Sequence, residues 1–401
     1  MIAVTEFVGI VLTAMFISIS INSGASEQLR AIPSENARKG GVNDIVVGQI
    51  ASVTNPATSE VATDYRDGIE LALARANAAG GVRGHRVRLQ VEDDNFDPAR
   101  TLPLALHLVQ DEGVVALVGC VGTGSLAQLE RSHFLEDHQI ADFAHLTGAR
   151  TEMSADLVFP IRGSYEDEVD AMLAHAATLG RHRIGFLYWR VGAGPQLASE
   201  ILAMIKTRGL DLVASEGFDV AKDPAAQAAS ARRAVRVPHE PAPDAIVLIA
   251  AGQPLAAAVH EIRAAYGASM PIYCLGQVSL KSFVQAIGAQ DARNVSLSQV
   301  MPGLGRSQLP ISHEFLSDRS RLRPNLPESY AALEGYVAGR VLVQVLGRAA
   351  DFGSAAIARA ARESGVMDVG GFRVSYGASG KNKALQPIDM TIVGRDGELV
   401  R

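Results

Sequence analysis

The chain has 401 residues, of which 48% are hydrophobic and 20% are charged, so it can bury a core and is not a disordered chain. At roughly 100–200 residues per domain, it is long enough for two domains. With 37 Lys+Arg against 43 Asp+Glu, the formal net charge is -6, which offers no basic surface for nucleic acid or for an anionic membrane.

An apolar run near the N-terminus predicts export. Residues 7–21 (FVGIVLTAMFISISI) have the length of a signal-peptide core, and Ser23 and Ala25 have the spacing that a signal peptidase accepts. The run is shorter than the about 20 apolar residues that span a bilayer. We therefore predict a signal peptide over residues 1–25, a disordered lead-in over 26–43, and a periplasmic protein. The alternative is an uncleaved membrane anchor, because no Lys or Arg precedes the run.

From residue 45 the sequence alternates strand-like and helix-like segments. Short apolar runs predict buried strands at 45–50, 87–91, 114–119 and 140–144. Helical periodicity predicts helices from about Thr63, from Asp97-Pro98, and over 126–138. Pro103 lies inside the second of these helices and is expected to kink it. Such alternation predicts βαβ units on a parallel sheet.

The same alternation restarts near residue 162. It predicts a helix at 167–179 and strands at 184–189, 210–218, 245–250 and 271–275. The last third predicts strands at 295–301, 371–376 and 389–393 and helices at 330–346 and 355–362. We expect these late segments to complete two earlier lobes, which requires several crossings between them. The predicted fold class is α/β, with two Rossmann-like lobes.

The glycine-rich turn at residues 119–125 (GCVGTGS) lies between a predicted strand and a predicted helix. Exposed backbone N–H groups at a helix N-terminus favour an anion, and Thr123 and Ser125 add hydroxyl donors, so the turn suits a carboxylate. Its spacing matches neither the dinucleotide fingerprint, nor a P-loop, nor a nucleophile elbow. We therefore predict no cofactor and no enzyme activity. A plain tight turn without a ligand is the alternative.

Other chemistry-bearing residues favour structural roles. Cys120 and Cys274 predict two buried free thiols, without a disulfide framework or a zinc site. The ten histidines show no metal-binding spacing, so we predict no metal site and expect surface or loop positions for His133, His138 and His145. The run at 92–94 (EDD) is expected to be a solvated strand end.

Six stretches share a pattern with a known family. They are 67–72 (DGIELA), 77–84 (NAAGGVRG), 92–94 with 97–99, 116–119 with 122–123, 333–336 (LEGY) and 389–397 (DMTIVGRDG). Together they resemble the type I periplasmic binding proteins, in the branch of leucine/isoleucine/valine-binding proteins that serve as substrate-binding subunits of ABC transporters. The resemblance covers residues 44–401, and its most specific part is the 77–84 run before a strand that ends in Glu-Asp-Asp.

The resemblance implies two lobes joined by three hinge crossings, near 161–164, 298–302 and 364–370. Lobe 1 would comprise 44–162 plus about 299–365, and lobe 2 would comprise 163–298 plus about 366–401. A small-molecule ligand would lie between the lobes, which close on it by hinge motion. The implied partner is an ABC permease in the membrane, the protein is expected to be a monomer, and the implied processes include amino acid transport.

The resemblance also implies ligand-binding residues. The ligand carboxylate would be held by Thr123, Gly124 and Ser125, and a second loop would contribute Leu146, Thr147 and Gly148. In the second lobe the candidates are Trp189, Gln253 and Gln277.

The second lobe departs from the family pattern. Gln277 stands where amino-acid binders have an acidic residue, and the aromatic residues usual after Trp189 and near Gln253 are missing. Phe96 also stands where the family has a disulfide cysteine. We therefore expect a carboxylate- or amide-bearing ligand without an ammonium group. Two alternatives stay open: a ligand-sensing receptor domain of the same fold, and an enzyme with a Rossmann-like lobe.

Overall fold

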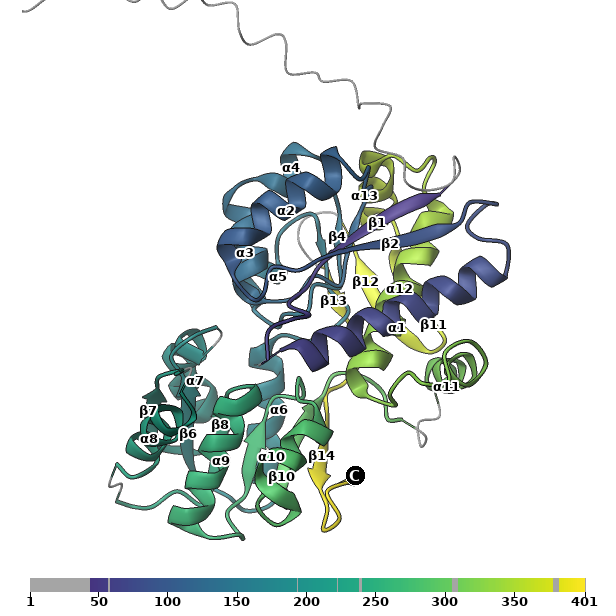
Figure 1. The fold of residues 1–401 in the computed structure, drawn as a ribbon. Helices are drawn as coiled ribbons and strands as arrows, with labels where there is room; N and C mark the ends of the chain where they lie inside the picture. Colours follow the sequence, from purple (N-terminus) through teal and green to yellow (C-terminus); the bar gives the residue numbers. More distant parts are fainter. Residues whose placement is uncertain are drawn as a thin grey trace, which may run out of the picture.

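The computed structural model describes residues 44–56, 58–192, 194–221, 223–237, 240–304, 309–377 and 382–400. The predicted signal peptide and lead-in lie outside this part of the chain. Figure 1 shows two α/β lobes stacked end to end, with the chain passing between them more than once. The prediction of an α/β fold with two lobes is confirmed. No helix within the described ranges is both long and apolar enough to cross a bilayer.

The first lobe contains a parallel sheet with the strand order β2-β1-β3-β4-β5. Four of its strands lie where the sequence predicted them: β1 (Ile45–Ile50), β2 (Val87–Glu92), β3 (Leu117–Val118) and β4 (Asp142–Phe143). The fifth, β5 (Val158–Phe159), was not predicted. Because the strands are parallel, their carboxyl ends meet at one edge of the sheet. This edge carries the loops that contain the first-lobe candidates.

Helices cover both faces of this sheet (Figure 1). They are α1 (Ser59–Ala78), α2 (Pro98–Gln110), α3 (Thr123–Arg131), α4 (Phe134–Asp137), α5 (Arg150–Met153), α11 (Pro310–Leu322), α12 (Tyr330–Arg348) and α13 (Ser354–Arg362). The Asp97 carboxylate caps α2 by accepting the Ala99 N–H, and the helix runs on through Pro103. The predicted helix over 126–138 is instead two helices, because His133 has a left-handed φ of 54° between them.

The second lobe contains a mixed sheet with the order β15-β14-β10-β9-β8-β6-β7, in which β14 is antiparallel to β10 and to β15. Its strands are β6 (Arg183–Trp189), β7 (Asp211–Phe218), β8 (Ala245–Ile249), β9 (Ile272–Cys274), β10 (Val295–Gln299), β14 (Asp389–Val393) and β15 (Leu399–Val400). Its helices are α6 (Tyr165–Thr178), α7 (Gly194–Thr207), α8 (Pro224–Val235), α9 (Gly252–Tyr266) and α10 (Leu280–Ala292).

Helices α1 and α12 of the first lobe approach so closely that their backbones touch. A Cβ added to Gly68 would lie 2.0 Å from the Ala332 carbonyl oxygen, and one added to Gly335 would lie 1.9 Å from the Tyr65 carbonyl oxygen. Only glycine fits at such a contact. The glycines in the DGIELA and LEGY stretches therefore hold together two helices that are far apart in the sequence.

The hydrophobic cores locate the crossings between the lobes. Ile161 belongs to the first-lobe core and Tyr165 to the second, so one crossing lies between them. Leu297 belongs to the second-lobe core and Val300 to the first, which places another crossing at the end of β10. Both lie within or next to the expected ranges of 161–164 and 298–302.

The third crossing lies later than we expected. Residues 365–384 form a three-stranded antiparallel sheet of β11 (Gly365–Val369), β12 (Phe372–Tyr376) and β13 (Lys383–Ala384), and Met367, Phe372 and Tyr376 are buried in the first-lobe core. The expectation of a crossing at 364–370 was wrong, because Gly370-Gly371 forms a hairpin turn there instead. After β10, the chain returns to the second lobe only at β14.

Candidate ligand-binding site

The first-lobe candidates come together at the carboxyl ends of β3 and β4. Thr123 is the first residue of α3, preceded by Gly122 with a left-handed φ of 112°. The Thr123 and Thr147 hydroxyl oxygens lie 2.8 Å apart within hydrogen-bond distance. The Leu146 N–H donates to the Cys120 carbonyl oxygen (2.7 Å), which extends the parallel pairing of β3 and β4 into the two loops. Backbone pairing thus fixes both loops side by side.

Ser125 supplies a buried donor in the first turn of α3. Its side chain is 3% exposed, and its hydroxyl has no hydrogen-bond partner among the residues that the structure describes. A buried hydroxyl without a partner costs free energy unless a ligand or water completes it. Together with the N–H groups at the start of the helix, this hydroxyl is suited to an anionic oxygen.

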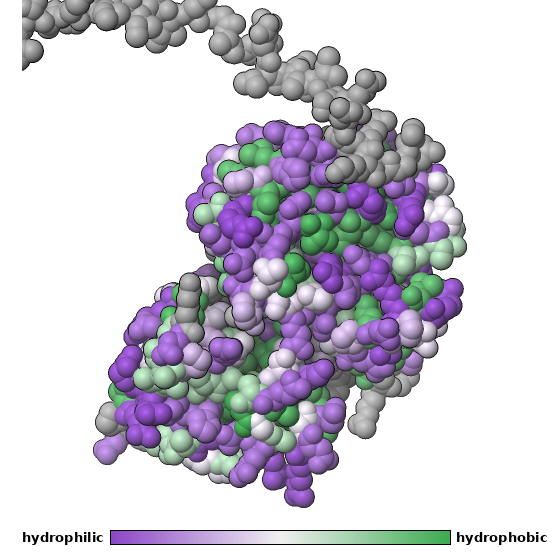
Figure 2. Space-filling view, viewed as in Figure 1, coloured by the Kyte–Doolittle hydropathy of each residue, from purple (hydrophilic) through white to green (hydrophobic). Residues whose placement is uncertain are grey.

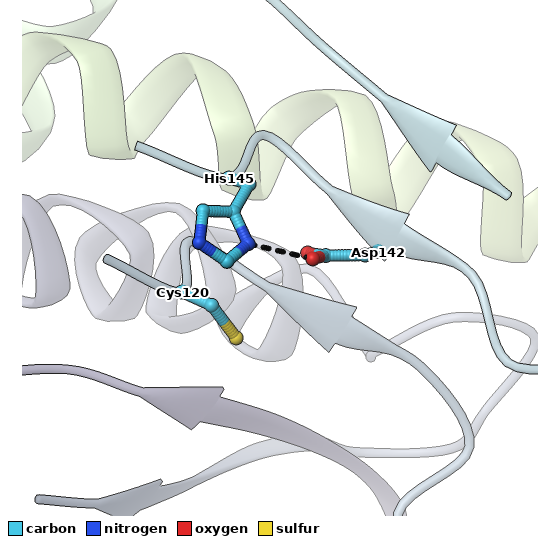
Figure 3. Close-up of side chains that lie close together, drawn as sticks. All are labelled: Cys120, Asp142 and His145. Carbon is cyan, nitrogen blue, oxygen red and sulfur yellow. Dashed lines mark hydrogen bonds and ion pairs between the residues drawn. The ribbon is translucent and has the colours of Figure 1, made fainter. Parts of the chain in front are cut away.

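A buried histidine supports the turn from beneath. The His145 ring lies 2.7 Å from an Asp142 carboxylate oxygen through Nδ1 and 3.0 Å from the Gly122 carbonyl oxygen through Nε2. Both His145 and Asp142 are buried, and Figure 3 shows the ring between Asp142 and the end of β3. His145 lies in a loop, which agrees with the expectation of a surface or loop position, and these two hydrogen bonds hold it in the interior. The hydrogen bond to its carbonyl oxygen therefore helps to fix Gly122 at the N-terminus of α3.

Cys120 lies beside this pair. The possible ligand atoms of Cys120, Asp142 and His145 lie within 4.8 Å of one another. However, both ring nitrogens of His145 are already engaged with protein oxygens, and burial raises the pKa of the Cys120 thiol well above its usual range. This chemistry does not fit a metal site, so the cluster is a structural support. Cys120 and Cys274 are both buried and free, as predicted.

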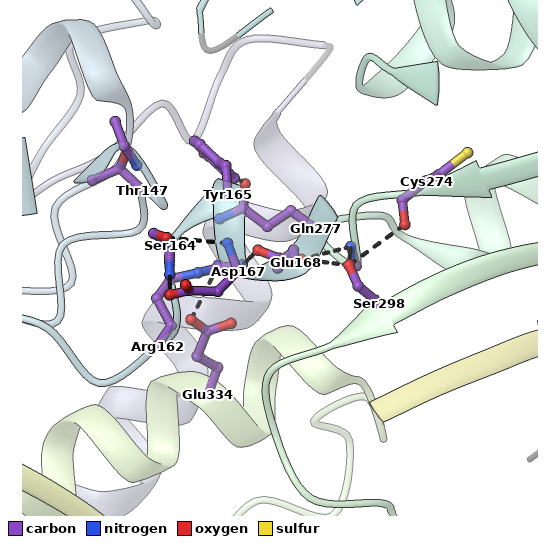
Figure 4. A network of polar contacts seen from close by, with 12 residues as sticks. Thr147, Arg162, Ser164, Tyr165, Asp167, Glu168, Cys274, Gln277, Ser298 and Glu334 are labelled. Atoms are coloured by element: carbon purple, nitrogen blue, oxygen red, sulfur yellow. Dashed lines mark hydrogen bonds and ion pairs between the residues drawn. The ribbon is translucent and has the colours of Figure 1, made fainter. Parts of the chain in front are cut away.

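A buried ionic network joins the two lobes beside the hinge. Arg162, at the first crossing, lies 2.7 Å from the Glu168 carboxylate of α6 and 3.2 Å from the Glu334 carboxylate of α12. The Ser298 hydroxyl, near the second crossing, donates to the other oxygen of Glu168. Figure 4 shows Arg162 between the two carboxylates, with Ser298 on the far side of Glu168. The network therefore connects a helix of each lobe with two crossings.

The charges in this network are unequal, with two carboxylates facing one guanidinium. Burial lowers the pKa of Arg162, but the neighbouring Glu334 and Glu168 outweigh it, so the pKa is raised overall and the guanidinium stays charged. Burial, opposed by Arg162 and assisted by Glu168, raises the pKa of Glu334. Glu334 is therefore the carboxylate whose charge is the less well compensated.

A small pocket, partly open to solvent, lies between the lobes next to this network. First-lobe, second-lobe and hinge residues all line it: Val61, Leu146, Tyr330, Ala331, Glu334, Gly276, Gln277, Val278, Ser298, Gln299, Val300 and Met301. Figure 2 shows the molecule narrowing where the two lobes meet. The pocket combines an apolar wall with the Glu334 carboxylate and the Gln277 amide.

Of the second-lobe candidates, Gln277 lies in this pocket and the other two do not. The Gln277 Oε1 accepts a hydrogen bond from the Tyr165 hydroxyl (3.2 Å), while its Nε2 has no partner in the described part of the chain. Gln253 is exposed at the start of α9. Trp189 is half-buried and packs against the second-lobe core, with Gly192 and Gly194 close to it.

Sequence reasoning did not single out four residues that the structure brings to the site: Tyr165, Arg162, Ser298 and Glu334. Tyr165 packs against Gly148, where a Cβ would lie 2.6 Å from the ring, so it connects the first-lobe loop with Gln277. A signal for Glu334 existed in the LEGY stretch, whose glycine brings the start of α12 close to α1. Nothing in the sequence indicated that Arg162 would meet it.

Comparison with known proteins identifies the family. The sequence model of the periplasmic binding protein family matches residues 44–398, so the chain belongs to this family. A substrate-binding periplasmic protein from Ralstonia solanacearum is 26% identical, with a TM-score of 0.78 over 89% of this chain and 99% of that one. LivJ of Streptococcus pneumoniae in complex with isoleucine is 18% identical, with a TM-score of 0.71 over 89% and 97%, and shows the fold alone.

A curated relative matches over a shorter stretch. The Leu/Ile/Val-binding protein homolog 3 of Brucella melitensis is 36% identical over 81 residues, which cover 20% of this chain and 22% of that protein. The match therefore spans about a fifth of that relative's length. These similar proteins bear names of binding proteins, and amino-acid-binding members are among them.

Proposed function

We propose that this protein is the extracytoplasmic solute-binding subunit of an ABC importer. It binds a small carboxylate- or amide-bearing, amino-acid-like ligand between its lobes and does not change the ligand chemically. The observation that carries the proposal is the pocket at the hinge, lined from both lobes and lying next to the turn at residues 122–125. Closed lobes would then present one surface to a membrane permease.

Ligand chemistry follows from the polar groups on each side. Ser125 and the amides at the start of α3 suit a carboxylate oxygen. The Gln277 Nε2 suits an acceptor on the ligand, and the Glu334 carboxylate suits an N–H donor such as an amide or amino group. Val61, Leu146, Val300 and Met301 favour an apolar group between these ends. The acceptor that Glu334 offers widens the expected ligand class to amino-bearing acids.

Closure would be driven by differential binding. A ligand held by the first-lobe turn gains contacts with Gln277 and its neighbours only when the lobes are together, so it shifts the population toward the closed form. Micromolar affinity needs about 8 kcal/mol net. A few hydrogen bonds to charged groups and the burial of an apolar side chain are sufficient for this.

The proposal is tested by a thermal-shift screen of the mature protein with amino acids, organic acids and amides, followed by calorimetry of each hit. A binder raises the unfolding midpoint by mass action. Small-angle X-ray scattering with the best binder should then show a smaller radius of gyration. A verified tight ligand that leaves the scattering profile unchanged would reject hinge closure.

The competing receptor assignment differs in its attachment to the membrane. An importer subunit is expected to lose residues 1–25 on export, whereas a membrane-attached sensor would keep them. N-terminal sequencing of the exported protein separates these outcomes. Retention of the apolar run would favour the receptor.

A further inference from the structure

The loop after β2 crosses the edge of the first sheet to reach the ligand turn. β2 and β3 are separated by β1 in the sheet order, so their ends lie about 10 Å apart. Phe96, in the loop after β2, spans this distance: a Cβ on Gly122 would lie 3.2 Å from its ring. The ring therefore covers the residue that precedes the first residue of α3.

Phe96 is held in an unusual backbone conformation. Its φ is 61° and that of Asn95 is 53°, both in the left-handed region. Asparagine tolerates this region, whereas a bulky aromatic residue does so rarely, at a cost on the order of 1–3 kcal/mol. The sequence thus keeps a phenylalanine at a position whose backbone favours glycine or asparagine.

Hydrogen bonds from buried and half-buried groups hold this conformation. The Asp94 carboxylate, which is 1% exposed, accepts the Phe96 N–H (2.9 Å) and the Thr101 hydroxyl (3.3 Å). The Asp93 carboxylate accepts the Asn95 N–H (2.8 Å). The EDD stretch is therefore an anchor for the loop and not simply a solvated strand end, since Asp94 is buried.

The Phe96 ring is only partly used by the fold. It is 41% exposed, which makes it a large apolar surface beside a polar turn. Its covered side lies on Gly122. Its remaining surface is exposed, and its contact residue Gly122 directly precedes Thr123.

We propose that Phe96 is a specificity-determining residue of the ligand site, whose ring selects carboxylates that carry an apolar or aromatic group close to the acid. This inference rests on the proposed function, because it needs a carboxylate at the turn. It deepens that function by adding, to the apolar wall of the pocket at the hinge, a second determinant of apolar selectivity that lies outside the pocket. The loop conformation places the ring over Gly122.

The test uses three variants. In Phe96→Asn, asparagine tolerates the left-handed backbone but the ring is removed. Phe96→Leu and Leu179→Asn are compared with it. Leu179 is 56% exposed in the second lobe, so its variant controls for loss of exposed apolar surface. Propanoate, 4-methylpentanoate, phenylacetate and L-leucine are titrated by calorimetry into each protein. The unfolding midpoints are recorded in parallel.

We expect Phe96→Asn to weaken the tightest apolar probe about three- to tenfold, the range of one lost aromatic contact. Its midpoint should stay within about 3 °C of wild type, because relief of backbone strain offsets the lost burial. Phe96→Leu should keep 4-methylpentanoate binding and lose phenylacetate preference, and Leu179→Asn should match wild type.

Two results would overturn the inference while leaving the proposed function intact: wild-type affinities in Phe96→Asn, or a weakening that accompanies a large fall in its midpoint, which would make the ring a structural plug. If the wild type binds none of these probes and no compound of the broader screen, the proposed function is overturned. This inference is then overturned with it.

Discussion

The two sides of the cleft are built in different ways. On the first lobe, the turn that we propose holds the ligand is fixed by backbone pairing between strand ends, by the buried His145 beneath Gly122, and by the contact of Thr123 with Thr147. On the second lobe, Gln277 is held through Tyr165, whose position depends on the hinge. A preformed half and a hinge-dependent half are what capture by closure requires.

The largest effect is expected from breaking the buried ionic network at the hinge. Arg162→Met should lower the free energy of unfolding by about 3–5 kcal/mol, because it leaves two buried carboxylates without their cation. Urea denaturation measures this loss. Arg190→Met, which breaks an exposed pair with Asp219, is the matched control and should cost no more than about 1 kcal/mol. Equal losses in the two variants would show that the network does not hold the lobes together.

Removing the hydroxyls of the preformed half should weaken binding with little effect on stability. For the double variant Thr123→Ala with Ser125→Ala we expect roughly a tenfold or greater loss of affinity for the best carboxylate, since each hydrogen bond contributes about 0.5–1.5 kcal/mol. Calorimetry measures the loss. Unchanged affinity would exclude the turn as the carboxylate site.

Raising the pH should reveal the charge imbalance at the hinge. Because the pKa of Glu334 is raised in the fold by burial, the fold favours its protonated form. Its contribution to stability is present below the unfolded pKa of about 4.3 and is lost as pH rises through the raised folded value. Glu334→Gln, which can still accept from Arg162, should therefore gain stability relative to wild type as pH rises. Urea midpoints between about pH 4 and pH 8 measure this, and a difference that does not change with pH would contradict it.

The smallest effect is expected at Gln253. This side chain is exposed at the start of α9 and does not line the pocket, so Gln253→Ala should change ligand affinity by less than about twofold. The same titration on Gln277→Ala should show a clear loss. If Gln253→Ala weakens binding as much as Gln277→Ala does, closure must bring α9 into the site.

The sequence predicted the lobes well because hydrophobic runs and helical periodicity are local signals. The resemblance to the family indicated Thr147 in a second loop beside Thr123 and Ser125. The parallel strands do bring their following loops to one edge, where the Thr123 and Thr147 hydroxyls meet. The sequence could not place Arg162 opposite Glu334, because that meeting depends on the orientation of the lobes. The third crossing was placed at 364–370 by analogy with the family, and the local sequence did not show that Gly370-Gly371 forms a hairpin turn there.

The backbone contact of α1 with α12 has a consequence for the order of folding. The second lobe, except for β14 and β15, comes from one continuous stretch of chain, whereas the first lobe needs α12 to complete its core. Contacts between such distant segments pay a larger loop-closure entropy and form slowly. The half of the molecule that begins the described chain therefore becomes complete only after nearly all of the rest has been synthesised.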